Sequence, residues 1–212
     1  MNIGFMGGSF NPPHLGHLNA AKVFYTESKL DKLIIIPAKV SPFKVEEGYD
    51  TKDFQRFDMS VLCFNELNKH YGFNVEVSSM ELDRQGISYT YLTVNELKKI
   101  YPHAKLTMYV GSDMFFTLEK WKNSKEIFEN CTIYTRSRKE SEMSDLLTSK
   151  ALYESKYNAK ILISDDKEVV VSSTLIRDSL NAKKSSNCKN LLTEDVLRYI
   201  IKNKLYFQEQ YD

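Results

Sequence analysis

Two histidines near the N-terminus, His14 and His17, have the spacing that most clearly suggests chemistry. They stand three residues apart at the start of a predicted helix, so both imidazoles can project from its first turn. That helix, predicted from Leu15 to Ser28, would also present backbone N–H groups and the positive end of its dipole at the same place. The pair therefore predicts a site that binds a polyphosphate.

The residues around the histidines fit the same interpretation. Gly7 and Gly8 permit positive φ and would let a phosphate approach the backbone, while Gly16 would keep the site open. Pro12 and Pro13 fix φ, so the chain enters the helix at a defined angle. The stretch lacks both the G-x-G-x-x-G pattern and the Gly-Lys-Ser/Thr of a Walker loop. A lone H-x-x-H would more often be two surface histidines, but the double glycine and the proline pair favour the phosphate site.

A second candidate phosphate site lies in the last third of the chain, at Val171–Arg177. Ser172, Ser173 and Thr174 are typical N-cap residues of a helix that follows a β-rich run. Their hydroxyl and N–H groups, with Arg177 one turn further on, could bind phosphate oxygens. Alone, the segment is more simply a helix cap; together with the histidines, it predicts the opposite wall of one triphosphate site.

These two stretches carry a family resemblance. The sequence G-G-S-F-N-P-P-H-L-G-H, residues 7–17, resembles the (T/H)-x-G-H signature region of the nucleotidylyltransferase superfamily, most closely in the form of the bacterial nicotinate-mononucleotide adenylyltransferases. Val171–Arg177 resembles the family's I-S-S-T-x-I-R. Asn11 stands where the family more often has Asp, and because Asn keeps the local turn hydrogen bonds, we expect activity to survive the lost charge.

Further segments match the same family in order along the chain. Pro37–Lys44 resembles a segment that ends in a phosphate-contacting lysine, which maps to Lys44, although the family's usual Asn is replaced near Ala38-Lys39. Ser88-Tyr89-Thr90 resembles the family's S-Y-T, so the resemblance assigns Thr90 to a helix start whose N–H groups receive a carboxylate. Gly111-Ser112-Asp113 resembles its G-x-D, which gives Asp113 the adenosine ribose hydroxyls. Trp121, the only tryptophan, matches an aromatic residue that stacks on the pyridine ring. Taken singly, each of these residues has an ordinary structural explanation.

The resemblance implies three sets of site residues. The catalytic set is His17, His14, Lys44 and Arg177. The ATP-binding set is Gly7, Gly8, Ser9, Phe10, His14, His17, Gly111, Asp113, Ser173, Thr174 and Arg177. The substrate-binding set is Lys44, Thr90, Trp121 and Arg136.

The implied activity is transfer of AMP from ATP to nicotinate mononucleotide, which gives nicotinate adenine dinucleotide and pyrophosphate in NAD biosynthesis. Mg²⁺ is the expected cofactor, held mainly by the ATP phosphates, and no protein metal site is expected. A pantetheine-phosphate adenylyltransferase or a cytidylyltransferase shares the H-x-G-H region but usually lacks the Gly-Gly-Ser-Phe-Asn-Pro-Pro form together with a distant aromatic such as Trp121. A nucleotide sensor would need affinity but no transition-state donors such as Lys44 and Arg177. A class I synthetase fragment would need a KMSKS-like segment, which we do not find.

Short apolar runs alternate with helical spacing along the chain and must position these residues. The runs are Ile3–Met6, Leu33–Ile36, Phe73–Val77, Leu106–Val110, Cys131–Tyr134, Ile161–Ile163 and Val169–Val171. A helix is predicted from the spacing of Phe54, Phe57, Val61, Phe64, Leu67 and Tyr71, with Gly72 at its end. Alternating strands and helices predict an α/β fold: a Rossmann-like, doubly wound, mostly parallel sheet with helices on both faces. Such sheets place ligands beyond the carboxyl ends of their strands.

The bulk composition limits the remaining possibilities. The chain has 212 residues and a formal net charge of +1, which suits one domain over residues 1–212 and gives no electrostatic argument for a nucleic-acid partner. It has no long apolar run for a membrane and begins without a signal peptide. Three dispersed cysteines are typical of a reduced, cytoplasmic protein. An amphipathic helix at Leu192–Tyr206, starting at Thr193, would close the domain, with residues 207–212 frayed. A homo-oligomer is compatible with the sequence, which does not specify one.

Overall fold

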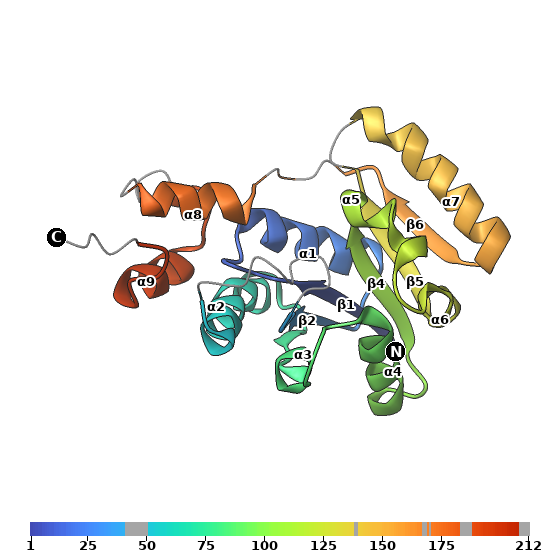
Figure 1. Cartoon of the computed structure of the whole chain (residues 1–212), viewed down its shortest axis with the longest axis horizontal. Coiled ribbons are helices and arrows are strands. Elements are labelled where there is room, and N and C mark those ends of the chain that lie inside the picture. The colour runs from blue at the N-terminus through green and yellow to red at the C-terminus, as the bar shows by residue number, and fades with distance from the viewer. Residues whose placement is uncertain (41–50, 138–139, 167–168, 170, 183–187, 208–212) are drawn as a thin grey trace.

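Six parallel strands form the centre of the molecule (Figure 1). The computed structural model describes residues 1–40, 51–137, 140–166, 169, 171–182 and 188–207. Within these residues the strands are β1 (Asn2–Gly8), β2 (Lys32–Pro37), β3 (Val75–Val77), β4 (Lys105–Gly111), β5 (Cys131–Arg136) and β6 (Lys160–Ser164). They lie in the order β3-β2-β1-β4-β5-β6, and every neighbouring pair is parallel.

Helices follow the strands along the chain. They are α1 (Leu15–Glu27), α2 (Asp53–Tyr71), α3 (Met80–Asp83), α4 (Thr90–Ile100), α5 (Ser112–Phe115), α6 (Ser124–Asn130), α7 (Met143–Tyr157), α8 (Ser173–Asn181) and α9 (Glu194–Lys202), with 3-10 turns at Leu118–Lys120 and Glu140–Glu142. The helix predicted from Leu15 is α1. The helix predicted around Phe64 is α2, which ends at Gly72 in the left-handed conformation, at φ 66°, where glycine carries no steric penalty. None of the described helices is long and apolar enough to cross a bilayer.

The sheet is covered on both faces, as the predicted fold class requires. Leu33 and Ile35 of β2 belong to a core that includes buried residues of α1, α2, α8 and α9. Their neighbours Ile34 and Ile36 point the other way, into a core shared with α4, α5, α6 and α7. Because alternate residues of a strand face opposite sides, a strand buried on both faces must be apolar throughout. This explains the unbroken run Leu33–Ile36 and confirms the doubly wound α/β prediction.

The strand order reverses between β1 and β4, which makes their carboxyl ends the expected ligand-binding edge. From β1 the chain proceeds outward to β2 and β3, then returns to β4 on the other side of β1 and proceeds to β5 and β6. The two central strands end at Gly8 and Gly111. Both glycines belong to the predicted nucleotide site, so the topology alone brings these two parts of the site to one edge.

Three sequence predictions require correction. Val169 and Val171 lie in no strand, residue 170 is outside the described residues, and β6 is the last strand of the sheet. The carbonyl oxygen of Val169 instead lies against Gly16 of α1. On α2, Phe54, Val61 and Tyr71 are exposed, because the buried face is rotated toward Met59 and Cys63. The last helix begins after Thr193 as predicted but ends at Lys202, before Tyr206.

Candidate active site

The loop between β1 and α1, residues 9–14, begins the site at the end of the central strand. Phe10 is buried and has a left-handed backbone at φ 46°, which places its ring under the end of β1. A side chain at position 8 would collide with that ring at 2.9 Å, so Gly8 is required by packing. Neither Gly7 nor Gly8 adopts the positive φ that the sequence suggested. A Cβ at Gly7 would meet only the carbonyl oxygen of Ile36 at 3.9 Å, so at this position the edge is open among the described residues.

His14 and His17 stack on one another at the start of α1. Their ring centroids lie 3.7 Å apart with an interplanar angle of 16°, as their predicted shared face requires. The Nδ1 atom of His14 accepts a hydrogen bond from the backbone N–H of His17 at 3.3 Å and so caps the helix. A neutral imidazole that accepts at Nδ1 carries its proton on Nε2, which makes the other ring nitrogen a donor. His14 is buried, and Phe10 contacts the His17 ring edge-on at 5.1 Å.

Gly16 serves the histidines in a different way from the one predicted. A Cβ at this position would lie 2.8 Å from the Val169 carbonyl oxygen and 3.1 Å from two atoms of the His14 ring. The glycine is therefore needed for close packing against Val169 and the His14 ring, not for open space. The first turn also presents fewer donors than expected, because the N–H of Leu15 donates to the Leu191 carbonyl and that of His17 to His14.

Helix α8 meets the β1–α1 loop directly, although more than 160 residues separate them. The Ser173 hydroxyl donates to the Pro12 carbonyl at 2.8 Å. The Arg177 guanidinium donates to the Asn11 carbonyl at 2.9 Å and to the Thr174 hydroxyl at 3.2 Å. A guanidinium carries five N–H groups, so these two bonds leave donors for an anion. The structure thus brings together the two segments that the sequence predicted as opposite walls of one triphosphate site.

Ser172 is the N-cap of α8. Its hydroxyl accepts from the N–H of Leu175 at 3.1 Å, which is the standard capping bond. The N–H groups of Ser173 and Thr174 come before any intrahelical acceptor and point out of the helix end. Together with Arg177, they form a donor array of the kind that binds phosphate oxygens.

Three supporting residues of the loop were missed from the sequence. Arg56 on α2 has no exposed surface; it donates to the Ser9 carbonyl at 2.8 Å and pairs with Asp53 at 2.7 Å. The side-chain oxygen of Asn11 accepts from Thr51 at 2.5 Å and from Tyr206 at 2.6 Å. An arginine within an amphipathic helix, three residues after an aspartate, could have indicated the first; the sequence carries no comparable signal for Thr51 or Tyr206.

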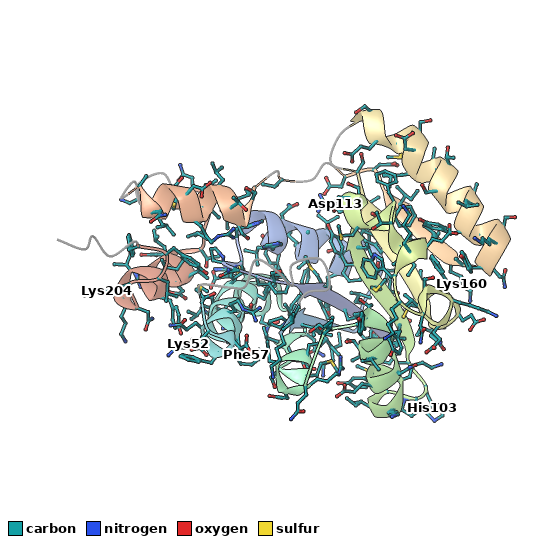
Figure 2. All side chains as sticks on the ribbon, in the orientation of Figure 1. Lys52, Phe57, His103, Asp113, Lys160 and Lys204 are labelled. Atoms are coloured by element: carbon teal, nitrogen blue, oxygen red, sulfur yellow. The ribbon has the colours of Figure 1, made fainter. Side chains whose placement is uncertain are left out.

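The end of β4 supplies the next part of the edge. Gly111 caps the short helix α5, on which Asp113 is exposed (Figure 2). The neighbouring Ser112 is buried and donates to Glu142 at 3.0 Å. Arg136 lies beside Gly111 in the sheet register, has no exposed surface, and donates to Asn19 at 3.1 Å and to Asp166 at 3.0 Å. Arg136 therefore lies at the edge of the site, but its charge is already paired.

A second cluster surrounds the start of α4. Thr90 is the first residue of that helix, as predicted. Ser88 connects it to the chain after β2, because its N–H donates to Val40 at 3.0 Å and its hydroxyl accepts from the N–H of Lys39 at 3.1 Å. The Nζ atom of Lys122 lies 4.5 Å from the centroid of the Tyr89 ring, which brings the Trp121 turn next to the start of α4. The Trp121 indole N–H donates to Thr117 at 3.4 Å.

Beneath this cluster lies a buried carboxyl group. Glu81 accepts a hydrogen bond from the Thr93 hydroxyl at 2.5 Å. Arg84, which like Glu81 lies between β3 and α4, donates to the same hydroxyl at 3.2 Å. Burial raises the pKa of Glu81 above its usual value, although hydrogen bonds from Thr93 and Ser88 oppose the shift. We call the β1–α1 loop with α8 the phosphate region, and Ser88–Thr90 with the Trp121 turn the acceptor region.

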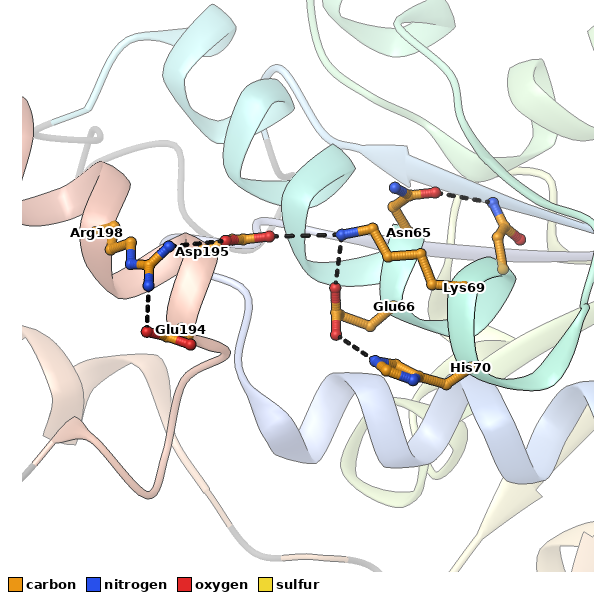
Figure 3. Close-up of polar contacts among 8 residues, drawn as sticks. Asn65, Glu66, Lys69, His70, Glu194, Asp195 and Arg198 are labelled. Carbon is orange, nitrogen blue, oxygen red and sulfur yellow. Dashed lines mark hydrogen bonds and ion pairs between the residues drawn. The ribbon is translucent and has the colours of Figure 1, made fainter.

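Lys44 falls outside the described residues, so its predicted role is not located. A hollow of about 530 Å³ is lined by residues of α1 and α2 and by Val169, Thr193 and Glu194, none of which is a predicted site residue. Beside it, Lys69 of α2 pairs with Glu66 of the same helix at 3.1 Å and with Asp195 of α9 at 3.6 Å, and the second pair connects the two helices (Figure 3).

The phosphate region suits phosphate oxygens better than a metal ion. Its side chains supply imidazole, guanidinium and hydroxyl donors. Within the described ranges, no three His, Cys, Asp or Glu side chains are grouped so as to hold a metal. Such a site can align polyphosphate anions and stabilise charge on them.

Comparisons with known proteins identify the same kind of enzyme. The cytidylyltransferase-like family matches residues 5–179 of this chain. The chain is 36% identical to a protein of Carboxydothermus hydrogenoformans named probable nicotinate-nucleotide adenylyltransferase, over 96% of this chain and 97% of that one. It is 32% identical to the nicotinate-nucleotide adenylyltransferase of Bacillus subtilis, with coverage of 96% and 97%.

Solved structures show the same fold at lower identity. The nicotinic acid mononucleotide adenylyltransferase of Plasmodium falciparum, in complexes with APC and with NaAD, superimposes with a TM-score of 0.75 and 16% identity over 97% of this chain. The matches cover 96% and 97% of those two chains. A putative nicotinate-nucleotide adenylyltransferase of Vibrio parahaemolyticus superimposes with a TM-score of 0.65 and 22% identity. The match covers 99% of this chain and 98% of that one.

Proposed function

We propose, since this chain belongs to the cytidylyltransferase-like family and within it to the nicotinate-nucleotide adenylyltransferases, that it transfers AMP from ATP to nicotinate mononucleotide, giving nicotinate adenine dinucleotide and pyrophosphate. The observation that carries the proposal is the meeting of α8 with the β1–α1 loop at the reversal point of the sheet. Two phosphate-binding segments from distant parts of the chain form one edge there, as a triphosphate site requires.

The transfer needs no covalent enzyme intermediate. An oxygen of the mononucleotide phosphate bonds to the α-phosphorus of ATP, and the bond from that phosphorus to the bridging oxygen of the β-phosphate breaks, so pyrophosphate leaves. The enzyme contributes alignment of two anions and stabilisation of charge on the transferring group. In our assignment His17 donates to the α-phosphate oxygens, while His14 Nε2 and Arg177 hold the β and γ groups.

The remaining site residues receive roles from the geometry or, for Lys44, from the family resemblance alone. Ser173 and Thr174 would add N–H donors to the triphosphate. Asp113, exposed at the end of β4, suits the ribose hydroxyls of the adenosine. Lys44 keeps the phosphate-contacting role that the family resemblance implies. Arg136, which is fully buried and paired with Asp166, would act by shaping the pocket edge and not by direct charge.

Mg²⁺ is proposed as the metal of the reaction, bound mainly by the ATP phosphates and water. Bound there, it would neutralise charge on the phosphates. The donor set of the phosphate region fits this arrangement, because imidazole and guanidinium donors contact phosphate oxygens and leave the metal to the ligand. We also propose a cytoplasmic location, which the three buried free thiols, Cys63, Cys131 and Cys188, support.

The acceptor region supports a preference for the acid form of the mononucleotide. Thr90 opens α4, so the helix N–H groups and dipole there favour a carboxylate over a neutral amide. Trp121, whose turn lies beside the start of α4, would stack on the pyridine ring, as the family resemblance implies.

Pyrophosphate release in the presence of ATP and one candidate acceptor at a time tests the proposal. We expect release with nicotinate mononucleotide, formation of the dinucleotide, and a lower kcat/KM with the amide mononucleotide. Turnover with 4′-phosphopantetheine or a cytidine nucleotide, and none with nicotinate mononucleotide, would assign the chain to another branch of the family. Equal kcat/KM values for the acid and the amide would remove the role given to Thr90.

A further inference from the structure

Tyr206, in the segment after α9, is one of the residues that support the β1–α1 loop, and no role in the reaction is assigned to it above. Its hydroxyl donates to the side-chain oxygen of Asn11 at 2.6 Å, across 195 residues of sequence. The same oxygen accepts from Thr51 at 2.5 Å. Asn11 is buried, and its backbone carbonyl accepts from Arg177 of the phosphate region. One loop residue therefore connects the C-terminal segment to the proposed triphosphate site.

The chain after α9 is folded so as to place this hydroxyl. The N–H of Leu205 bonds back to Ile200 at 3.0 Å, and the Leu205 side chain is buried in the core. Tyr206 then adopts a left-handed backbone at φ 66°, which is unfavourable for a bulky residue unless neighbouring contacts offset its cost. Phe10, directly before Asn11, has the same kind of backbone at φ 46°. Tyr206 and the residue before its partner Asn11 thus both have left-handed backbones where the two segments meet.

We propose that Tyr206 is a positioning residue for the nucleotidyl transfer, acting through Asn11. Tyr206 and Arg177 hold the side-chain and backbone oxygens of the same residue, so together they fix the loop that leads into His14. Without the hydroxyl, Asn11 can shift and carry with it the Pro12 carbonyl, which Ser173 contacts. The β1–α1 loop and α8 then shift relative to one another. This impairs the alignment of the two substrates in the transition state more than it lowers the stability of the fold. The inference rests on the proposed function.

Tyr206→Phe isolates the hydroxyl, and Tyr199→Phe is its matched control. Tyr199 lies on α9 and donates its hydroxyl to Asp58 at 2.8 Å, away from the loop. For Tyr206→Phe we expect kcat to fall about fivefold to tenfold, the upper range for one neutral hydrogen bond, with KM for the mononucleotide changed less than twofold. Tyr199→Phe should keep the wild-type kcat. A wild-type kcat in folded Tyr206→Phe, or an equal fall in both variants, overturns the inference.

The route through Asn11 is tested by repeating Tyr206→Phe in an Asn11→Asp background. Hydrogen bonds to a charged acceptor are roughly twice as strong as neutral ones, so the loss should be larger there than in the wild type. An identical loss in both backgrounds would show that the effect bypasses residue 11. ATP affinity measured by calorimetry on Tyr206→Phe and Tyr199→Phe gives a result without turnover, and of these two we expect weaker binding only for Tyr206→Phe. A wild type that binds ATP but forms no dinucleotide would refute the proposed function and leave this affinity test of Tyr206 standing.

Discussion

The phosphate region and the acceptor region are held in place very differently. The loop of the phosphate region receives hydrogen bonds from α2, α8, Thr51 and the chain beyond α9. In the acceptor region, the Trp121 turn is connected to the start of α4 by a cation–π contact and rests on a 3.4 Å bond to Thr117. The loop of the phosphate region is thus held by hydrogen bonds from four other segments. The acceptor region is held by two hydrogen bonds from Ser88 to the chain after β2 and by the contacts of the Trp121 turn with Tyr89 and Thr117.

This difference matches what each region has to do. Charge stabilisation in a transition state depends on donors fixed before the reaction, because reorganising them costs part of the benefit. Stacking on a flat ring tolerates small displacements, since its energy varies slowly with position. We therefore expect changes in the phosphate region to act on kcat and changes in the acceptor region to act on the mononucleotide KM.

The largest effect is expected for His17→Ala. Loss of one preorganised donor to the transferring phosphate costs roughly 3–4 kcal/mol, or about 10²- to 10³-fold in kcat. Steady-state kinetics with both substrates would measure it, with unfolding temperature as a check on the fold. His103→Ala, on the exposed turn after α4, is the control and should be neutral. Near-normal turnover of His17→Ala would remove this histidine from the mechanism.

Arg177→Lys should have the next largest effect, because it keeps the charge and loses the fork that contacts Asn11 and Thr174. Hydrogen bonds to charged groups contribute about 1.5–3 kcal/mol, so we expect kcat/KM for ATP to fall roughly tenfold to a hundredfold. Arg198→Lys, in the surface ion-pair chain of Figure 3, should change it little. Equal kinetics for the two variants would contradict the bracing of the loop by α8.

Trp121→Ala tests the acceptor region. Stacking of a base on an aromatic side chain contributes about 1–3 kcal/mol, so the mononucleotide KM should rise about tenfold or more while kcat stays within a few-fold. Trp121→Phe keeps a ring and should recover most of the affinity. A fall in kcat with an unchanged KM would show that the two regions do not divide the work as proposed.

Glu81→Gln should have the smallest effect on turnover and a clear one on stability. Burial raises the folded-state pKa of Glu81 above its unfolded value near 4.5. The stability contributed by the protonated group is therefore full below that pH and is lost as pH rises through the folded pKa. Glutamine cannot ionise, so the unfolding temperature of Glu81→Gln should improve relative to the wild type from about pH 4.5 upward. Glu129→Gln, at an exposed position, is the control. Parallel curves of unfolding temperature against pH for Glu81→Gln and the wild type would show that burial does not raise the pKa of Glu81.

Sequence patterns predicted the parts of this molecule that depend on local chemistry. Six of the seven predicted strand runs form the sheet. The glycines at its reversal point, Gly8 and Gly111, lie where two of the predicted strands end. The buried face of α2 could not be predicted, because Phe54 is apolar yet exposed while Arg56 is charged yet buried. Position in the fold, and not residue type, decided both.

The supports of the loop were also beyond sequence patterns. Tyr206 and Asn11 are 195 residues apart, and a hydroxyl–amide contact leaves no periodic signal. The meeting of Ser173 with Pro12 was predicted only in outline, from two motifs that each suit phosphate. The roles given to individual site residues are predictions, and the kinetic measurements on the variants above test them.

Amide hydrogen exchange on addition of ATP tests most directly whether the β1–α1 loop and α8 form one triphosphate site. Addition of ATP alone should slow exchange in residues 7–17 and 172–178 together, and the start of α4 should respond only when the mononucleotide is added. Slowing in one of the two segments without the other would contradict the shared site.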